Sequence, residues 1–196
     1  MLEAFTKTSL AESMISSLAI SAGCIWIGYW MGAQETPIQA ALWVLGGMAS
    51  WSFFEYLIHR FLFHLSETAF KGSKRIQYVL HGVHHEYPND IERILMPTLP
   101  KILLALPFFG LFYLFFGKAG SFFSSGFMMG YYIYSLMHYS MHRFKAPEFL
   151  KSLWAHHHLH HHFQDKGFGL SSTLWDHVFN TMPPNPSKQK RGEYRS

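Results

Sequence analysis

The chain has 196 residues, enough for a single domain, and 14% of them are charged while 49% are hydrophobic. Because a soluble domain usually carries about a quarter charged residues, this composition argues against one and indicates membrane spans. The net charge of +4 does not indicate a nucleic-acid-binding protein, since the basic residues flank apolar stretches and form no stripe. The single cysteine, Cys24, excludes an intramolecular disulfide and a thiolate zinc cluster.

Four stretches of the chain contain no Asp, Glu, Lys or Arg, and a bilayer-crossing helix needs about 20 mostly apolar residues. We predict transmembrane helices over approximately residues 13–34, 36–58, 101–117 and 119–140. The third is the shortest, and it contains Pro107, which should kink it. This segment either extends through its flanks, with Lys101 and Lys118 snorkelling to the surface, or enters the bilayer without crossing it fully.

Short turns at 34–37 and 117–120 join these spans in pairs and predict two helical hairpins. Of the 16 Lys and Arg residues, only Lys118 falls in the two turns, which leaves 15 on the other side. Since cytosolic loops carry the excess of positive charge, the termini and the segment 66–100 are expected in the cytosol. The predicted fold is an all-α, multi-pass integral membrane protein with four transmembrane helices in two hairpins and a cytosolic helical cap.

The cap is expected to contain helices that lie along the membrane interface. Residues 75–80 and 148–154 mix basic and large apolar side chains in the manner of such helices. Residues 1–182 are predicted to form a single membrane domain. The segment 183–196 has three prolines and many charges and is predicted to be disordered.

Ten of the 14 histidines form four tight groups, each just beyond a hydrophobic stretch. Imidazole binds iron, zinc, copper and nickel well, and ten imidazoles are more than one ion can use. Burying them without partners would cost several kcal/mol, so they predict a multi-metal site at the membrane face. The candidate ligands are His59, His64, His81, His84, His85, His138, His142, His158, His161 and His162.

The spacing within each group indicates how the ligands converge. Residues four apart, and triplets spaced i, i+3, i+4, share one face of a helix. His59 and His64 are five apart, about 140° around an α-helix, so they are expected to approach a site from two sides. Outside the pattern, and interpreted as surface groups or as groups that orient ligands, are His156, His157, His160 and His177.

Carboxylates near the histidines are scarce, and the candidates are Glu55, Glu86, Asp90, Asp165 and Asp176. Soluble di-iron bundles use Glu-x-x-His pairs, which this chain lacks, so the predicted dimetal site is almost wholly histidine. Zinc hydrolysis, which needs a general base and an open coordination position, stays open as an interpretation. A pair of metals that activates O2 fits a lipid-facing pocket better.

The motif order H-x4-H, H-x2-H-H, H-x3-H, H-x2-H-H over two hairpins resembles the fatty acid hydroxylase superfamily, which includes sterol desaturases. Within it, the chain is most similar to the fatty acid 2-hydroxylases. The resemblance covers residues 51–181. It is carried by the segment from Glu55 to His64, by His81 to His85 with Pro88 and residues 93–100, and by Gly167-Phe168-Gly169 with Trp175, Asp176 and Phe179.

The resemblance implies that the ten candidate histidines hold two metal ions, functionally iron, although zinc can occupy the same nitrogens in a purified sample. It implies a membrane hydroxylase that uses O2 and two electrons. The implied substrate is the fatty acyl chain of a sphingolipid, ceramide or related lipid, oxidised next to the carbonyl. Eukaryotic members often carry a cytochrome b5 domain, and only about a dozen residues precede the first span here. A separate electron-transfer protein of the cytochrome b5 or ferredoxin type is therefore expected.

Four further residues are candidates for orienting ligands or contacting substrate: Tyr134, Tyr139, His157 and Asp176. Tyr134 and Tyr139, with Tyr131 and Tyr132, fit either an acyl path or ordinary packing near the interface. The family often has Asp where Ser135 follows Tyr134 here, so any role of that Asp does not carry over.

Other readings use the same histidines. A desaturase, a carotenoid hydroxylase or a sterol-modifying oxidase would share the site, because the spacing does not separate hydroxylation from desaturation. The segment from His59 to His64 favours acyl hydroxylation. A non-catalytic membrane metal-binding protein or a transporter should place ionisable ligands near the middle of the membrane, whereas these histidines lie at the ends of the spans.

Overall fold

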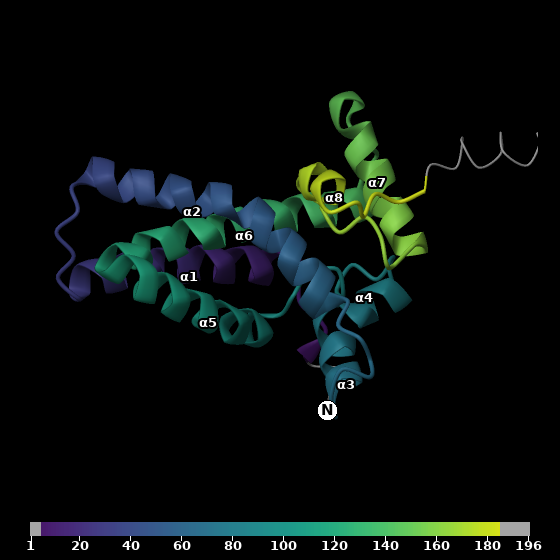
Figure 1. The fold of residues 1–196 in the computed structure, drawn as a ribbon, viewed down its shortest axis with the longest axis horizontal. Coiled ribbons are helices and arrows are strands. Elements are labelled where there is room, and N and C mark those ends of the chain that lie inside the picture. Colours follow the sequence, from purple (N-terminus) through teal and green to yellow (C-terminus); the bar gives the residue numbers. More distant parts are fainter. Residues whose placement is uncertain (1–4, 185–196) are drawn as a thin grey trace, which may run out of the picture.

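The computed structural model describes residues 5–184, and within these residues every regular element is helical. Long helices lie side by side as a bundle, and short helices form a cap at one end of it (Figure 1). The bundle helices are α1 (Leu10–Trp30), α2 (Pro37–Ile58), α5 (Thr98–Phe116) and α6 (Gly120–Arg143). The all-helical prediction is confirmed for the described residues.

Local signals in the sequence start the first two helices. The Ser9 side chain accepts a hydrogen bond from the Glu12 amide and caps α1. Thr36 and Gln39 form a capping box at the start of α2, and Pro37 occupies its first position, where a missing N–H is harmless. The turn 34–37 predicted from the sequence is therefore the N-terminal cap of α2.

Helix α6 is the centre of the bundle and packs against α1, α2 and α5. Its glycines allow close approach, because a Cβ at Gly126 would overlap the Val44 carbonyl oxygen of α2. A Cβ at Gly130 would likewise overlap the Trp51 side chain. Small residues at such contacts are typical of helix packing in membranes, where backbones come together without a hydrophobic driving force.

Helix α5 differs from its prediction at its start. It begins at Thr98 and continues through Pro107, so the span extends through Lys101. Lys101 does not snorkel: its side chain is 2% exposed. Its Nζ donates hydrogen bonds to the Ser13 carbonyl and to the hydroxyls of Ser13, Ser16 and Ser17 on α1, at 2.7–3.1 Å. A buried ammonium needs hydrogen-bond acceptors in place of water, and the serines of α1 supply them.

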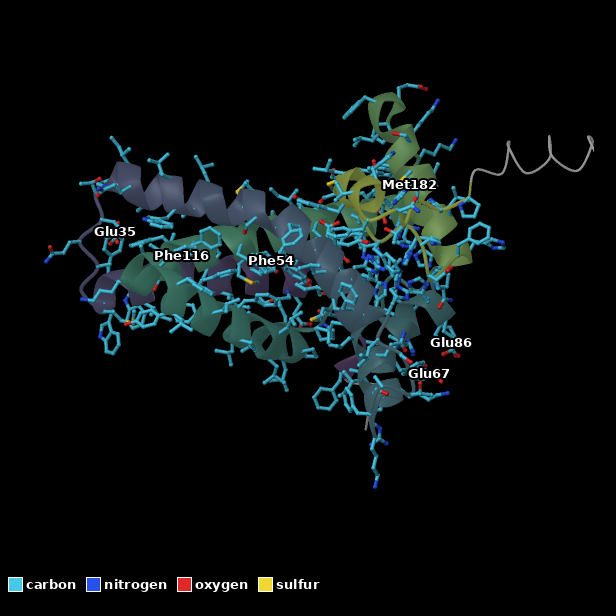
Figure 2. All side chains as sticks on the ribbon, viewed as in Figure 1. Glu35, Phe54, Glu67, Glu86, Phe116 and Met182 are labelled. Carbon is cyan, nitrogen blue, oxygen red and sulfur yellow. The ribbon has the colours of Figure 1, made fainter. Side chains whose placement is uncertain are left out.

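Three helical segments are long and apolar enough to cross a membrane: Leu10–Trp30, Pro37–Phe63 and Thr98–Arg143. The last contains α5, a 3-10 turn η4 (Gly117–Ala119) and α6. Large apolar side chains such as Trp30, Ile38 and Leu114 are exposed on this bundle, as expected where lipid is the solvent. Glu35 lies at the end of the bundle far from the cap, and Glu67 and Glu86 lie at the cap (Figure 2).

The cap is built from short helices at the ends of the bundle helices. Two of them, η2 (His59–Phe63) and η3 (Tyr78–Gly82), are π-helical turns, which are frequent at functional sites. In Figure 1, α7 and α3 extend from opposite sides of the cap. The cap helices are η2 (His59–Phe63), α3 (Ser73–Gln77), η3 (Tyr78–Gly82), α4 (Val83–Glu86), η5 (Glu148–Leu150), α7 (Lys151–His162) and α8 (Leu174–Val178).

The predicted interfacial segments both fall in the cap. Residues 75–80 fall in α3 and η3, and residues 148–154 fall in η5 and α7. The segment predicted to be disordered, 183–196, lies outside the described residues from position 185 onward.

Candidate metal centre

Many side-chain nitrogen atoms crowd together in the cap (Figure 2). Ten imidazoles of the cap and the neighbouring helix ends form two groups of five. Group 1 is His59, His64, His81, His85 and His160. Group 2 is His84, His138, His142, His157 and His161. Within each group, one ring nitrogen from every residue lies within 4.8 Å of all the others.

The nitrogen spacing fits five ligands around one ion. In group 1, Nε2 of His81 lies 3.1 Å from that of His59 and 3.0 Å from that of His85. In group 2, Nε2 of His84 lies 3.0 Å from that of His138. With metal–nitrogen bonds of about 2.0–2.1 Å, ligands at right angles lie about 3 Å apart. A neutral imidazole has one N–H, so five clustered rings cannot satisfy one another by hydrogen bonds alone.

Each histidine triplet of the cap serves both groups. His81 and His85 are four residues apart and enter group 1, while His84 enters group 2. On α7, His157 and His161 are likewise four apart and enter group 2, while His160 enters group 1. Residues four apart share a helix face and an adjacent residue is rotated by about 100°, so one short helix supplies ligands to two neighbouring sites.

A π-helical turn places the first pair in a single group. The His64 amide donates to the His59 carbonyl at 3.0 Å, an i to i+5 bond, and the two ring centroids are 5.1 Å apart. The wider π-turn brings His64 nearer to the face of His59 than the 140° expected in an α-helix, and both rings enter group 1.

On α7 the structure differs from the predicted ligands by one residue. His158 and His162 lie in neither group: His158 is exposed, with Nδ1 2.7 Å from the Trp154 carbonyl, and His162 is exposed against Phe163. His157 and His160 lie in the groups in their place.

The run from His156 to His162 allows the H-x2-H-H spacing in two registers, and a shift of one residue turns the face by about 100°. The buried Trp154 does not choose between them, because His157 and His158 follow it at i+3 and i+4 and both positions share its helix face.

The other candidates have different surroundings. Tyr134 is buried, with its ring centroid 5.7 Å from that of His138. Tyr139 is half-buried, and its side chain makes no hydrogen bond within residues 5–184. Neither imidazole group includes a carboxylate from the described residues, in line with the predicted all-histidine character.

A loop over residues 166–171, which we call the template loop, holds two ligands of group 1. Nδ1 of His59 donates to the Phe168 carbonyl at 2.6 Å, and Nδ1 of His160 donates to the Lys166 carbonyl at 2.7 Å. A carbonyl only accepts, so these bonds place the proton on Nδ1 and leave the lone pair of Nε2 facing the group.

Two buried carboxylates hold this loop in turn. Asp176 accepts from the amides of Phe168 and Gly169 at 2.9 and 2.7 Å. Glu55 accepts from the amides of Leu170 and Ser171 at 2.6 and 2.8 Å, and from the Ser171 hydroxyl. Asp176 is among the residues predicted to orient ligands or to contact substrate, but the role of Glu55 was missed, although it precedes His59 by one helical turn.

Burial keeps the imidazoles neutral. Burial, together with the neighbouring imidazoles, lowers the pKa of His64 and of His161 to about 3. Burial lowers the pKa of His160 to about 4, although its bond to the Lys166 carbonyl opposes this. A neutral imidazole is the form that binds metal, so both groups present free lone pairs at neutral pH.

Comparison with known proteins agrees with this geometry. The sequence model of the fatty acid hydroxylase family matches residues 44–181. The chain belongs to the fatty acid hydroxylase family. The resemblance expected for residues 51–181 is thereby confirmed.

Curated relatives of this hydroxylase-family chain carry 2-hydroxylase names. The dihydroceramide fatty acyl 2-hydroxylase of Arabidopsis thaliana is 37% identical over 155 residues, which cover 75% of this chain and 63% of that protein. The fatty acid 2-hydroxylase of Homo sapiens is 40% identical over 146 residues, covering 70% and 38%. The chain thus spans less than two thirds of the length of these relatives.

A solved structure shares the fold of this family member. The structure of full-length scs7p, in which only the hydroxylase domain is visible, matches with a TM-score of 0.82 at 28% sequence identity. The match covers 94% of this chain and 70% of that one.

Three hollows share lining residues with one another, the first on the side of the bundle and the last beside group 2. A groove of about 310 Å³ between α1, α5 and α6 is lined in part by Ala105 and Met128. Both residues also line a smaller cavity that reaches Met96 and Tyr131. Met96 and Tyr131 then border a cavity of about 20 Å³ whose wall includes His84, His138, Tyr134 and Ser135.

Proposed function

We propose that this chain is a membrane-bound, O2-dependent dimetal hydroxylase that 2-hydroxylates the fatty acyl chain of a sphingolipid, ceramide or related lipid. The observation that carries the proposal is the pair of five-imidazole groups at the end of an apolar helical bundle. Relatives named for fatty acyl 2-hydroxylation support the choice of substrate and position.

Each imidazole group would hold one metal ion. The proposed ligands are those of group 1 and group 2, with His157 and His160 in place of His158 and His162. Functional iron would supply the redox chemistry that places one oxygen atom from O2 on the acyl carbon, and zinc would bind the same nitrogens without it. The chain itself contributes position, an apolar surround and ligands kept neutral.

The acyl chain would enter laterally from the bilayer and lie in the groove between α1, α5 and α6. Its carbonyl end would point toward His84 and His138 along the path past Met96 and Tyr131. Met96 and Met128 border the narrow part, and flexible thioether side chains are suited to parting around a lipid. Holding the carbon next to the carbonyl beside the metals would fix the position of attack.

The membrane arrangement that suits this reaction has four crossings, formed by α1, α2, α5 and α6, within one domain over residues 1–182. The imidazole groups would lie on the cytosolic face, since the basic residues gather on the cap side and cytosolic loops are positively charged.

Two electrons for each hydroxylation would come from a separate protein of the cytochrome b5 or ferredoxin type. Within residues 5–184, the clusters able to hold metal are the two groups themselves. A donor that meets the cap would therefore complete the system.

Lipid analysis tests the proposal. Total fatty acids from cells making the native chain are compared by mass spectrometry with those from cells making His84→Ala with His85→Ala. The exposed His177, outside both groups, provides the matched control His177→Ala. We expect 2-hydroxy acyl species with the native chain and with His177→Ala only. New double bonds, oxidised sterols or oxidised carotenoids would instead assign a desaturase or another oxidase.

A further inference from the structure

The two imidazole groups differ in how their outer ring nitrogens are held. In group 1, the template loop binds Nδ1 of both His59 and His160. In group 2, Nδ1 of His84 and Nδ1 of His161 are buried and have no hydrogen-bond partner within residues 5–184. His142 hydrogen-bonds the backbone of Pro88. Nδ1 of His85 in group 1 is also without a partner in the described part of the chain.

The template loop is held along its backbone by both carboxylates. Four consecutive amides, from Phe168 to Ser171, donate to Asp176 or Glu55. The two carboxylates are 0% and 3% exposed, so water does not compete for these bonds. Charge-assisted bonds, such as those to Asp176, are about twice as strong as neutral ones.

Two glycines let the loop take this course. Gly167 has φ +73°, a left-handed conformation that side-chain-bearing residues rarely adopt. A Cβ at Gly169 would lie 2.9 Å from Oδ2 of Asp176 and would overlap the Ser172 carbonyl oxygen. The Gly167-Phe168-Gly169 motif is thus explained by the approach of the loop to Asp176.

Asp176 is itself fixed by other buried groups. His156 donates to its Oδ2 at 3.0 Å, and the Thr181 hydroxyl donates to its Oδ1 at 2.7 Å. His156 lies on α7 among the ligands but outside both groups, so it supports the loop and not a metal. Both carboxylates therefore act on group 1 through the loop.

We propose that Glu55 and Asp176 are positioning residues for the group 1 metal alone. By fixing the template loop they preset the rings of His59 and His160, so group 1 retains its ion tightly while group 2 releases its ion more readily. The inference rests on the proposed function, since it requires that both groups bind metal. Loss of a group that orients a metal ligand typically costs about 10- to 100-fold in metal affinity.

Metal content of the purified chain tests the inference directly. Total bound iron and zinc per chain is measured by elemental mass spectrometry for the native protein, Glu55→Gln and Asp176→Asn. The control is Asp165→Asn, an exposed carboxylate beside the loop. We expect about two ions in the native chain and the control, and about one in each of the two positioning variants. Two ions retained in both variants, or none, would overturn the inference.

Double variants show which ion is lost. Asp176→Asn combined with His85→Ala, a group 1 ligand, should still hold about one ion. Asp176→Asn combined with His84→Ala, a group 2 ligand, should hold almost none. The reverse pattern would mean that the loop serves group 2 and would overturn the inference.

A milder variant covers the case in which the carboxylate variants do not fold, as judged by helical circular dichroism in detergent. Ser171→Ala removes one bond to Glu55 and leaves both carboxylates in place. Release of metal to a chelator should show two phases in the native chain, and the slower phase should become about 10-fold faster in Ser171→Ala. An unchanged slow phase would contradict the inference. A native chain that binds fewer than two ions would contradict the dimetal proposal instead.

Discussion

His84 and His85 are consecutive in the chain, yet their rings enter different imidazole groups. Their ring planes are 74° apart and their centroids are separated by 5.9 Å. Nε2 of His84 faces His138 and His161, while Nε2 of His85 faces His81 and His160. The pair is the point at which one short helix supplies two sites.

Single substitutions of this pair should therefore remove different ions. We expect His84→Ala and His85→Ala each to lower bound metal from about two ions to about one. Each should also lower the yield of 2-hydroxy product by more than about 100-fold, because removing a ligand should exceed the 10- to 100-fold cost of losing an orienting partner. Elemental analysis beside lipid analysis checks both effects. Full activity in either variant would contradict the proposal that each group holds an ion that the reaction needs.

The register of α7 predicts opposite outcomes for neighbouring histidines. His157→Ala and His160→Ala should each lose about one ion and the activity, since their rings lie in group 2 and group 1. His158→Ala and His162→Ala should retain both, because these side chains are exposed. Elemental analysis and lipid analysis of the four variants distinguish the two registers. If His158→Ala lost metal and His157→Ala kept it, the register predicted from the sequence would be the right one.

The groove between α1, α5 and α6 should set acyl chain length. Ala105 lines this groove and the cavity beyond it, so Ala105→Trp should fill the space and shift the 2-hydroxy products toward shorter chains. Leu114 is exposed on the same helix, and Leu114→Trp is the matched control. Chain-length profiles of the products check the shift. An unchanged profile in Ala105→Trp would place the acyl chain elsewhere.

Packing at the centre of the bundle should depend on Gly126. Its replacement by Ala forces a Cβ against the Val44 carbonyl, and overpacking of this kind costs about 1–3 kcal/mol. That cost should lower Tm in detergent by roughly 2–12 °C. Gly23 has open space around its Cβ position, so Gly23→Ala should leave Tm unchanged or slightly higher. Equal Tm values for the two variants would argue against this contact between α2 and α6.

The absence of charged residues over a sufficient length was enough to predict approximately where α1 and α2 run, because apolar length sets a span directly. The same rule underestimated the length of α5, because the predicted span begins at Lys101. The hydrogen bonds from its ammonium to the serines of α1 show that this side chain is buried. Four crossings are a proposal, because α5 and α6 fall within one apolar helical segment, Thr98–Arg143.

Eight of the ten grouped imidazoles are among the ligands predicted from the sequence, because spacing along a helix places such histidines on one face. The remaining two depended on rotation about the helix axis, which a run of adjacent histidines leaves ambiguous. The π-helical turn at His59 and the template loop could not be predicted at all. Both depend on contacts between distant segments, such as Phe168 with His59 and Glu55 with Leu170.

The origin of the inserted oxygen atom tests the central claim most directly. Cells that make the native chain together with a cytochrome b5 or ferredoxin donor are grown under ¹⁸O2, and their 2-hydroxy fatty acids are analysed by mass spectrometry. We expect the native chain to yield 2-hydroxy acyl species that carry one ¹⁸O at the hydroxyl. Cells making the variant with both His84→Ala and His85→Ala should yield none. Hydroxyl oxygen derived from water, or no 2-hydroxy product in the presence of the donor, would contradict the assignment as an O2-dependent acyl hydroxylase.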